Sequence, residues 1–152
     1  MAACIRCEDR RTEGPSLSYQ AIYYRDRVGR MPVSDAIDTL GPTCQDSVDW
    51  QVRLLNDLSD VRPHLGDPHS SALKGEKYRA FRELRCDCGK QHHRILFRRS
   101  DRFFILLHII LNKEGEIPEQ DKRIALDRWN DFIARMDAVP TSKPRAMGKD
   151  AP

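Results

Sequence analysis

The 152-residue sequence contains no apolar run long enough to cross a bilayer, which takes about 20 consecutive apolar residues. The longest such run, residues 103–111, is interrupted by His108 and suits a buried strand. The first 16 residues carry several charges, Arg6 and Glu8 among them, and contain no apolar segment. We therefore expect no secretory leader and no membrane partner, and we predict a cytoplasmic location.

The sequence also lacks an even number of cysteines, which would allow all of them to pair. An odd count without a leader argues against a disulfide framework. The five cysteines are Cys4, Cys7, Cys44, Cys86 and Cys88. The first two and the last two could together supply four thiolates to zinc, but a C-x-C pair on one strand is not the usual zinc knuckle. We predict no metal site and no cofactor, and we interpret Cys44 as a small core residue.

The net charge of +3 conceals an uneven distribution. Residues 72–113 hold 11 Lys/Arg against 4 Asp/Glu, whereas residues 1–71 hold 8 against 11 and residues 114–152 hold 7 against 8. The basic middle of the chain is also the part whose pattern indicates strands. A basic sheet face suits a polyanion, because phosphates can replace bound counterions there, although a solvated strand face would have the same composition.

The pattern of apolar residues predicts four strands and three helices. The strands are expected over residues 19–24, 78–86, 92–98 and 102–111, and the helices over residues 32–40, 43–58 and 118–136. Short connections at Gly89 and at Ser100-Asp101 favour hairpins, and residues 103–111 are apolar on both faces, as in a central strand.

These elements predict an α+β fold, with a small antiparallel sheet on which two N-terminal helices and one C-terminal helix pack. We expect a flexible extension over residues 1–17, one domain over residues 18–137, and a disordered tail over residues 138–152, which is rich in Pro, Lys and Ser.

Five short motifs occur in order along residues 19–136. They are Arg30-Met-Pro-Val33, Leu73-Lys74-Gly75, Glu83-Leu84-Arg85, His93-Arg94-Ile95-Leu96-Phe97, and Leu106-Leu107-His108 followed by Pro118. Together they resemble the RelE/ParE superfamily of type II toxins, specifically its HigB-like, phage-derived branch. Each motif alone is weak, and the order and spacing of the five carry the resemblance.

The resemblance implies a RelE-like fold and a toxin that acts as a metal-independent, ribosome-dependent mRNA endoribonuclease and inhibits translation. It further implies three partners, which are the ribosome, messenger RNA and a helix-turn-helix (HigA-like) antitoxin encoded nearby. ParE-type relatives are similar in scaffold alone, since they poison DNA gyrase without cutting RNA.

RNA cleavage without a metal requires deprotonation of the 2′-hydroxyl, stabilisation of charge on the phosphate, and protonation of the leaving oxygen. Arg85 and Arg94 match arginines of the family patterns and should lie on neighbouring strands. Arginine binds phosphate through two parallel hydrogen bonds, so we predict that this pair clamps the scissile phosphate. The alternative for Arg85 is a structural salt bridge with Glu83, two residues away on the same strand face.

Two further residues complete the predicted catalytic set. Lys113 matches the second lysine of a family Lys-Lys pair and could supply charge or a proton, whereas Asn112 replaces the first. His92 should share a strand face with Arg94, and an imidazole can act as a base near neutral pH. The family pattern has an aromatic residue at His93, so neither histidine is carried over as catalytic.

Lys74, Lys90 and Arg98 are the predicted RNA-binding residues, because they add positive charge around the same strands. A solvated lysine is an equally good interpretation of Lys74. His108 matches a histidine of the family pattern but lies within an apolar strand, where a hydrogen-bonded core histidine is the commoner case.

Four functions stay open at this point. The first is the mRNA endoribonuclease that the resemblance implies, and the second is a ParE-like, non-enzymatic gyrase poison. The third is a catalytically weakened relative that only binds its antitoxin and operator DNA, and the fourth is a generic basic RNA-binding module.

Overall fold

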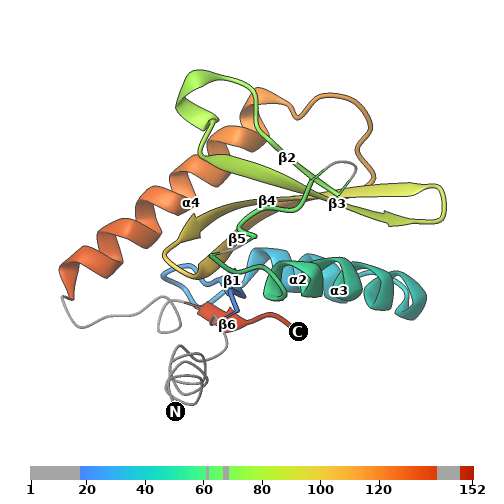
Figure 1. The fold of residues 1–152 in the computed structure, drawn as a ribbon, viewed down its shortest axis with the longest axis horizontal. Coiled ribbons are helices and arrows are strands. Elements are labelled where there is room, and N and C mark those ends of the chain that lie inside the picture. Colours follow the sequence, from blue (N-terminus) through green and yellow to red (C-terminus); the bar gives the residue numbers. More distant parts are fainter. Residues whose placement is uncertain (1–17, 61, 67–68, 140–147) are drawn as a thin grey trace, which may run out of the picture.

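The protein is built around a six-stranded sheet, described here from a computed structural model that covers residues 18–60, 62–66, 69–139 and 148–152 (Figure 1). The strands are β1 (Gln20–Tyr24), β2 (Ser70–Ala72), β3 (Phe81–Cys88), β4 (Gln91–Ser100), β5 (Phe103–Ile110) and β6 (Gly148–Asp150). Their order across the sheet is β2-β3-β4-β5-β1-β6, with β1 and β5 parallel and the other neighbours antiparallel. The predicted α+β fold is confirmed, with one parallel pair in the sheet.

The centre of the sheet is the β3-β4-β5 meander. Its turns place Gly89 and Asp101 at positive φ, +59° and +54°, which suits the tight connections predicted at these positions. The register between β4 and β5 shifts between Leu96 and Phe97, where β5 has one extra residue. This bulge in β5 puts the consecutive residues Leu107 and His108 on the same side of the sheet. The prediction that β5 is covered on both faces is confirmed by the buried residues on either side of it.

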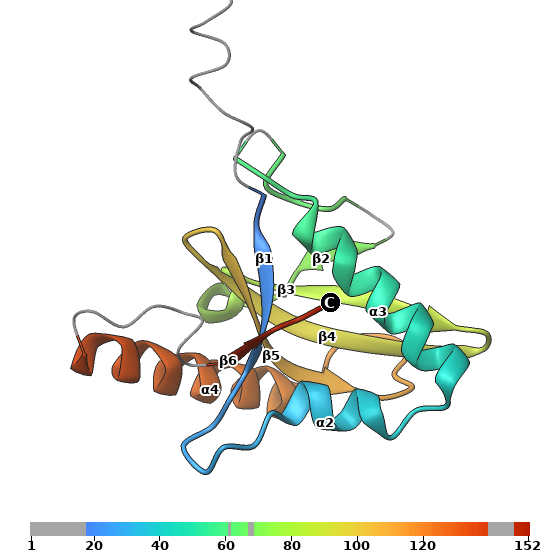
Figure 2. The ribbon, with the colours of Figure 1, turned by 90° about the horizontal axis from the view of Figure 1, so that it is seen from below.

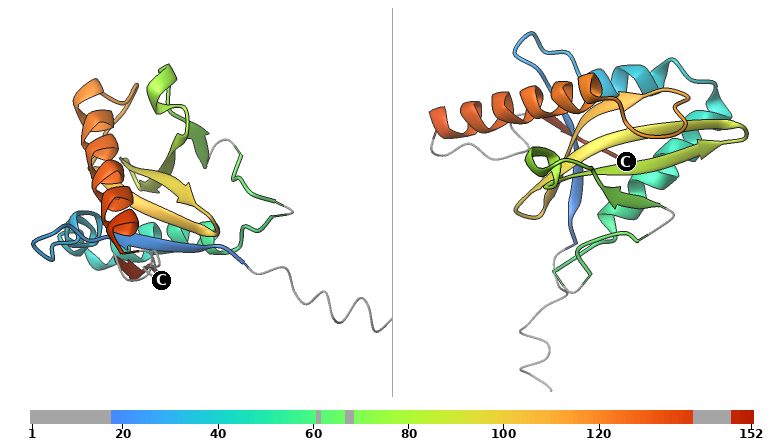
Figure 3. Two further views of the ribbon diagram at one scale, coloured as in Figure 1. Left: turned by 90° about the vertical axis from the view of Figure 1, so that its left-hand side faces the viewer. Right: turned by 90° about the horizontal axis from the view of Figure 1, so that it is seen from above.

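Three helices cover the two faces of the sheet, as predicted. Helices α2 (Pro32–Asp38) and α3 (Pro42–Asn56) pack on one face, and α4 (Glu119–Ala138) packs on the other. Figure 2 shows α2 and α3 in front of the strands, and the opposite view in the right panel of Figure 3 shows α4 on the near side. The buried stripe of α3 consists of Val48, Val52 and Leu55, and that of α4 consists of Ala125, Trp129 and Phe132. Of the described residues, none belongs to a helix with the length and apolarity that a bilayer crossing needs.

The end of the chain differs from the prediction of a disordered tail over residues 138–152. Helix α4 includes Ala138, and residues 148–150 form β6 on the open edge of β1. Ala151 is buried, its N–H donates to the carbonyl of Ala21 at 2.9 Å, and Asn56 donates to the carbonyl of Pro152 at 3.0 Å. The tail prediction is therefore wrong for these residues, because an unpaired strand edge can order a segment that has no apolar pattern of its own. Residues 140–147, and the extension predicted over residues 1–17, lie outside the described residues.

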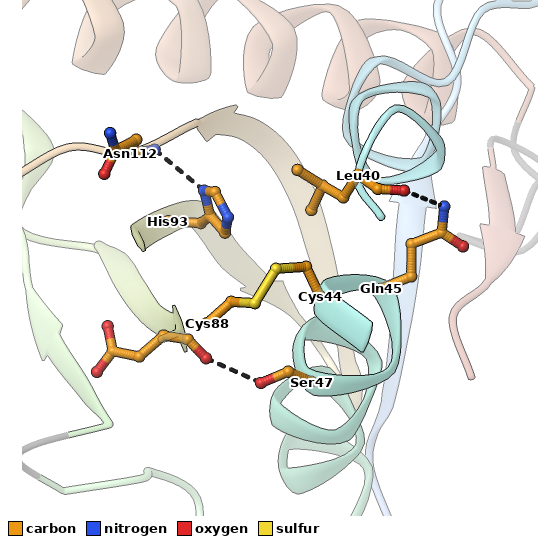
Figure 4. Close-up of a disulfide and its surroundings, with 8 residues drawn as sticks. Leu40, Cys44, Gln45, Ser47, Cys88, His93 and Asn112 are labelled. Atoms are coloured by element: carbon orange, nitrogen blue, oxygen red, sulfur yellow. Dashed lines mark hydrogen bonds between the residues drawn. A yellow bond between two sulfur atoms is a disulfide. The ribbon is translucent and has the colours of Figure 1, made fainter. Parts of the chain in front are cut away.

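A disulfide joins Cys44, near the start of α3, to Cys88 at the end of β3, with their Cα atoms 5.4 Å apart (Figure 4). The argument from the odd cysteine count against a disulfide framework and the interpretation of Cys44 as a small core residue are both wrong for this pair, because Cys44 is only partly buried and is bonded to Cys88. Strand alternation places Cys88 on the same face as the buried Cys86, and α3 covers that face. Beside the bond, the Ser47 hydroxyl donates to the Asp87 carbonyl at 2.8 Å. Oxidised Cys88 offers no thiolate to the zinc site considered from sequence.

We expect Cys44→Ser to lower the free energy of unfolding by about 4 kcal/mol, the loop-entropy value for a bridge between residues 44 positions apart. Urea unfolding of the two proteins, with and without a thiol reductant, measures the difference. The reductant should destabilise the wild type and leave Cys44→Ser unchanged. Equal sensitivity of both proteins to the reductant would contradict the bond.

Gly148 lies so close to β1 that a Cβ atom there would collide with the backbone oxygen of Tyr23 and with Cγ2 of Ile22. We expect Gly148→Ala to destabilise the protein by about 1–3 kcal/mol, the usual range for overpacking, and to speed hydrogen exchange of β1 amides. Gly66→Ala is the matched control, because a Cβ atom at Gly66 would meet nothing within 4 Å. Indistinguishable exchange in the two variants would show that β6 does not dock as described.

Candidate functional site

A cavity of about 280 Å³ opens on the sheet face that α4 covers only in part. Its walls are residues 71–73, at the end of β2 and just after it, and residues 115–117 of the loop that precedes α4. Four cations and two carboxylates line it, namely Lys74, Arg85, Arg94, Lys122, Glu83 and Glu116. We call it the basic cavity, since these groups carry a net positive charge.

The floor of the basic cavity is a pair of arginines that share one carboxylate. Arg85 on β3 and Arg94 on β4 are direct cross-strand partners, so the prediction that they are neighbours is confirmed. Glu83 lies between them, with its Oε1 2.9 Å from Arg85 Nε and its Oε2 3.1 Å from an Nη of Arg94. The Glu83 side chain is 7% exposed, and a buried carboxylate is stable as an ion only when it is paired in this way.

Strand alternation explains why these three groups meet. Glu83 and Arg85 are two residues apart on β3 and therefore point to the same face. The edge strand β2 adds Ser71, whose hydroxyl accepts a hydrogen bond from Arg85 at 3.0 Å and donates to Glu83 at 3.3 Å. The Arg85–Glu83 salt bridge weighed from sequence does form, and Arg85 still lines the cavity, so the two interpretations are compatible.

The rim of the basic cavity contains the second carboxylate. The Nζ of Lys74 lies 2.8 Å from Oε1 of Glu116, and both side chains are 80% exposed. This hydrogen bond raises the pKa of Lys74 and lowers the pKa of Glu116, so both groups stay charged at neutral pH. The Nζ of Lys122, in the first turn of α4, donates to the backbone carbonyl of Lys74 at 3.0 Å.

The structure places Lys74, Arg85 and Arg94 together, whereas the other predicted catalytic residues lie outside the described lining of the cavity. Lys113 follows β5, and its backbone N–H donates to the carbonyl of His92 at 2.7 Å. The His92 side chain binds Asp87 through Nδ1 at 2.8 Å.

The two remaining RNA-binding predictions fall on other parts of the sheet. The guanidinium of Arg98 stacks on Trp129, 4.4 Å from the ring centroid, and on Phe81 at 5.2 Å. Burial lowers the pKa of Arg98, whose guanidinium fills space between β4 and α4. Lys90 is exposed in the turn between β3 and β4.

Sequence reasoning missed three lining groups. Glu83 was considered only as a partner of Arg85, although its place on the same strand face could have put it in the site. Glu116 and Lys122 had no comparable signal, because they come from a loop and a helix whose docking position no local pattern encodes. Among the described residues, no group of three or more His, Cys, Asp or Glu side chains is arranged to hold a metal ion.

His108 is a structural residue beneath α4, as its apolar surroundings indicated. Its Nδ1 lies 3.2 Å from an Nη of Arg128, which can only donate, so Nε2 carries the proton and donates to Asp121 at 2.8 Å. Burial lowers the pKa of His108 and keeps the ring neutral. The interpretation as a hydrogen-bonded core histidine is confirmed.

The chain was also compared with known proteins. A family model described as "Phage derived protein Gp49-like (DUF891)" matches residues 35–130, which include α3, parts of α2 and α4, the meander and every charged residue of the basic cavity. The chain belongs to this family. The Gp49-like family is a RelE/toxin-like group, so the predicted resemblance holds at this level. No curated protein matches this Gp49-like chain.

The buried His93 and the largely buried His108 make the stability of this Gp49-like protein depend on pH. Burial lowers the pKa of both His93 and His108 in the folded protein, whereas both titrate near 6.5 when unfolded. The unfolded chain therefore binds more protons as the pH falls below about 7, and the free energy of unfolding should decrease until the folded pKa values are passed.

Urea unfolding at steps between about pH 7.5 and about pH 5.5 measures this slope. We expect His108→Gln, which can still donate to Asp121, to have a shallower slope than the wild type. An unchanged slope in this variant would contradict the assignment for His108.

Proposed function

We propose that this Gp49-like protein is the toxin of a type II toxin–antitoxin system and acts as a ribosome-dependent, metal-independent mRNA endoribonuclease that inhibits translation. The observation that carries the proposal is the pair Arg85 and Arg94, fixed side by side on the floor of an open, basic cavity. Guanidinium groups that are already oriented bind phosphate with little further ordering and stabilise charge that develops on it.

Five of the six charged groups described in the lining have a role in this proposal. Arg85 and Arg94 hold the scissile phosphate, and Lys74 and Lys122 hold the phosphate backbone at the rim. Glu83 is a positioning residue, because taking up a proton would remove the charge that holds both guanidiniums in place. Proton transfer would then fall to His92, two residues from Arg94 on the same strand face, or to groups of the ribosome.

The partners follow from the same proposal. They are the ribosome, messenger RNA and a helix-turn-helix (HigA-like) antitoxin, and the site of action is the cytoplasm, where translation takes place. In the HigB-like branch that the motifs resemble, a neighbouring gene encodes the antitoxin.

A second candidate function is a relative that binds its antitoxin without cutting RNA. The observation that favours it is that Glu83 already engages both arginines, which lowers the positive charge they can offer a phosphate. The absence of a lysine at position 112, where Asn112 stands, points in the same direction.

We expect Arg94→Ala to abolish the growth arrest that follows induction and to reduce mapped transcript cleavage by at least about 100-fold, the usual loss when one charge-stabilising donor is removed. Arg94→Lys keeps the charge but loses the bidentate geometry, so it should retain part of the cleavage. Arg123→Ala, on an exposed position of α4 outside the described lining, is the matched control and should cut like the wild type.

Thermal unfolding and antitoxin binding establish that each variant folds. Growth arrest with intact transcripts and double-strand DNA breaks would overturn the nuclease in favour of gyrase poisoning. A wild type that binds an antitoxin but neither arrests growth nor cuts transcripts would favour the second candidate.

A further inference from the structure

The two carboxylates of the basic cavity are held in different ways. Glu83 is 7% exposed and receives hydrogen bonds from two arginines, so it is a fixed part of the floor. Glu116 is 80% exposed and binds Lys74 at the rim. An ion pair in contact with water contributes only about 0–1 kcal/mol, so the Glu116 carboxylate can leave Lys74 at little cost.

Lys74 and Glu116 reach each other from separate segments that line the cavity. Lys74 lies between β2 and the 3₁₀ turn Glu76–Tyr78, whereas Glu116 lies in the loop between β5 and α4. Lys122 fixes the backbone of Lys74 through its carbonyl. Opening the ion pair therefore requires only rotation of two exposed side chains.

A phosphate entering this cavity would meet cations with unequal availability. Arg85 and Arg94 are oriented by the buried Glu83 carboxylate, and an incoming phosphate would bind them without displacing Glu83. Lys74 instead holds an exposed carboxylate, and a phosphodiester, which carries the same single negative charge, can replace it. The competition takes place in solvent, so dissolved salt screens it.

We propose that Glu116 is a built-in competitor for the phosphate group of the substrate, which must displace the Glu116 carboxylate before Lys74 can bind it. Glu116 thereby sets the affinity of the site for a phosphodiester and the dependence of that affinity on ionic strength. The identity of the ligand rests on the proposed function, whereas the competition itself rests on the rim geometry.

The test uses the full-length protein and a fluorescein-labelled single-stranded RNA in which every 2′-oxygen is methylated. Such an RNA binds but cannot be cut through its 2′-oxygen. Fluorescence anisotropy at about 50 mM and about 200 mM salt gives the affinity and its salt dependence. We expect Glu116→Gln to bind about three- to five-fold more tightly at the lower salt, in proportion to an exposed ion pair of up to ~1 kcal/mol.

Glu114→Gln is the matched control. Glu114 is 79% exposed on the same loop and lies 3.7 Å from His92, so its substitution removes the same charge without touching Lys74. We expect Glu114→Gln to tighten RNA binding clearly less than Glu116→Gln does. In a Lys74→Ala background, Glu116→Gln should lose most of its effect.

Equal tightening by the two glutamine substitutions, or a full effect of Glu116→Gln without Lys74, would overturn the competition. The result is independent of cleavage. If Glu116→Gln binds RNA more tightly but the wild type leaves cellular transcripts intact, the nuclease proposal is refuted and the competitor role of Glu116 stands. If the wild type cuts transcripts but Glu116→Gln does not bind RNA more tightly, the competitor role is refuted and the nuclease proposal stands.

Discussion

The buried carboxylate of Glu83 is the constraint on which the arrangement of the site depends. It engages Arg85 from its own strand and Arg94 from the next, and the bond to Arg94 requires the present β3–β4 register. A slip of one residue would turn Arg94 into the apolar core beneath α2 and α3, where its charge would have no partner. The ion pairs and the hydrophobic pattern therefore specify the same register, and the two guanidiniums are held in fixed positions.

The two faces of the sheet have different roles, since one is covered by helices and the other carries the charged site. One face is closed by α2 and α3 and is further tied by the Cys44–Cys88 bond, whereas α4 covers only part of the other face. The uncovered part, next to the first turn of α4, is the basic cavity. The bulge in β5 contributes to this division, since it turns His108 toward Asp121 on α4 and so anchors the helix start that supplies Lys122. The position of α4 thus determines both the size of the cavity and one of its cations.

The set of cations in the cavity differs from the set that the family motifs suggested. Asn112 stands where those motifs have a lysine, and Lys113 ties the loop after β5 to His92 through its backbone. The positive charge at the rim comes from Lys74, which belongs to the Leu73-Lys74-Gly75 motif, and from Lys122, which belongs to none of the motifs. Two carboxylates oppose these cations, one fixed and one exchangeable, so the cavity is a site of moderate rather than extreme positive charge. Such a balance suits a phosphodiester chain, in which each phosphate carries one negative charge.

The sequence by itself determined the order of the three helices and of β1, β3, β4 and β5, the two-sided burial of β5, and the pairing of Arg85 with Arg94, because the periods of helices and strands decide which face each residue occupies. The three-residue strand β2 was not predicted, because it is too short to show a period. Tertiary structure alone decided the Cys44–Cys88 bond, the docking of β6, and the entry of Glu116 and Lys122 into the cavity in place of Lys113. Each of these depends on which distant segments meet. A local period assigns a side chain to a face, but the segment that closes over that face is chosen by the packing of the whole chain.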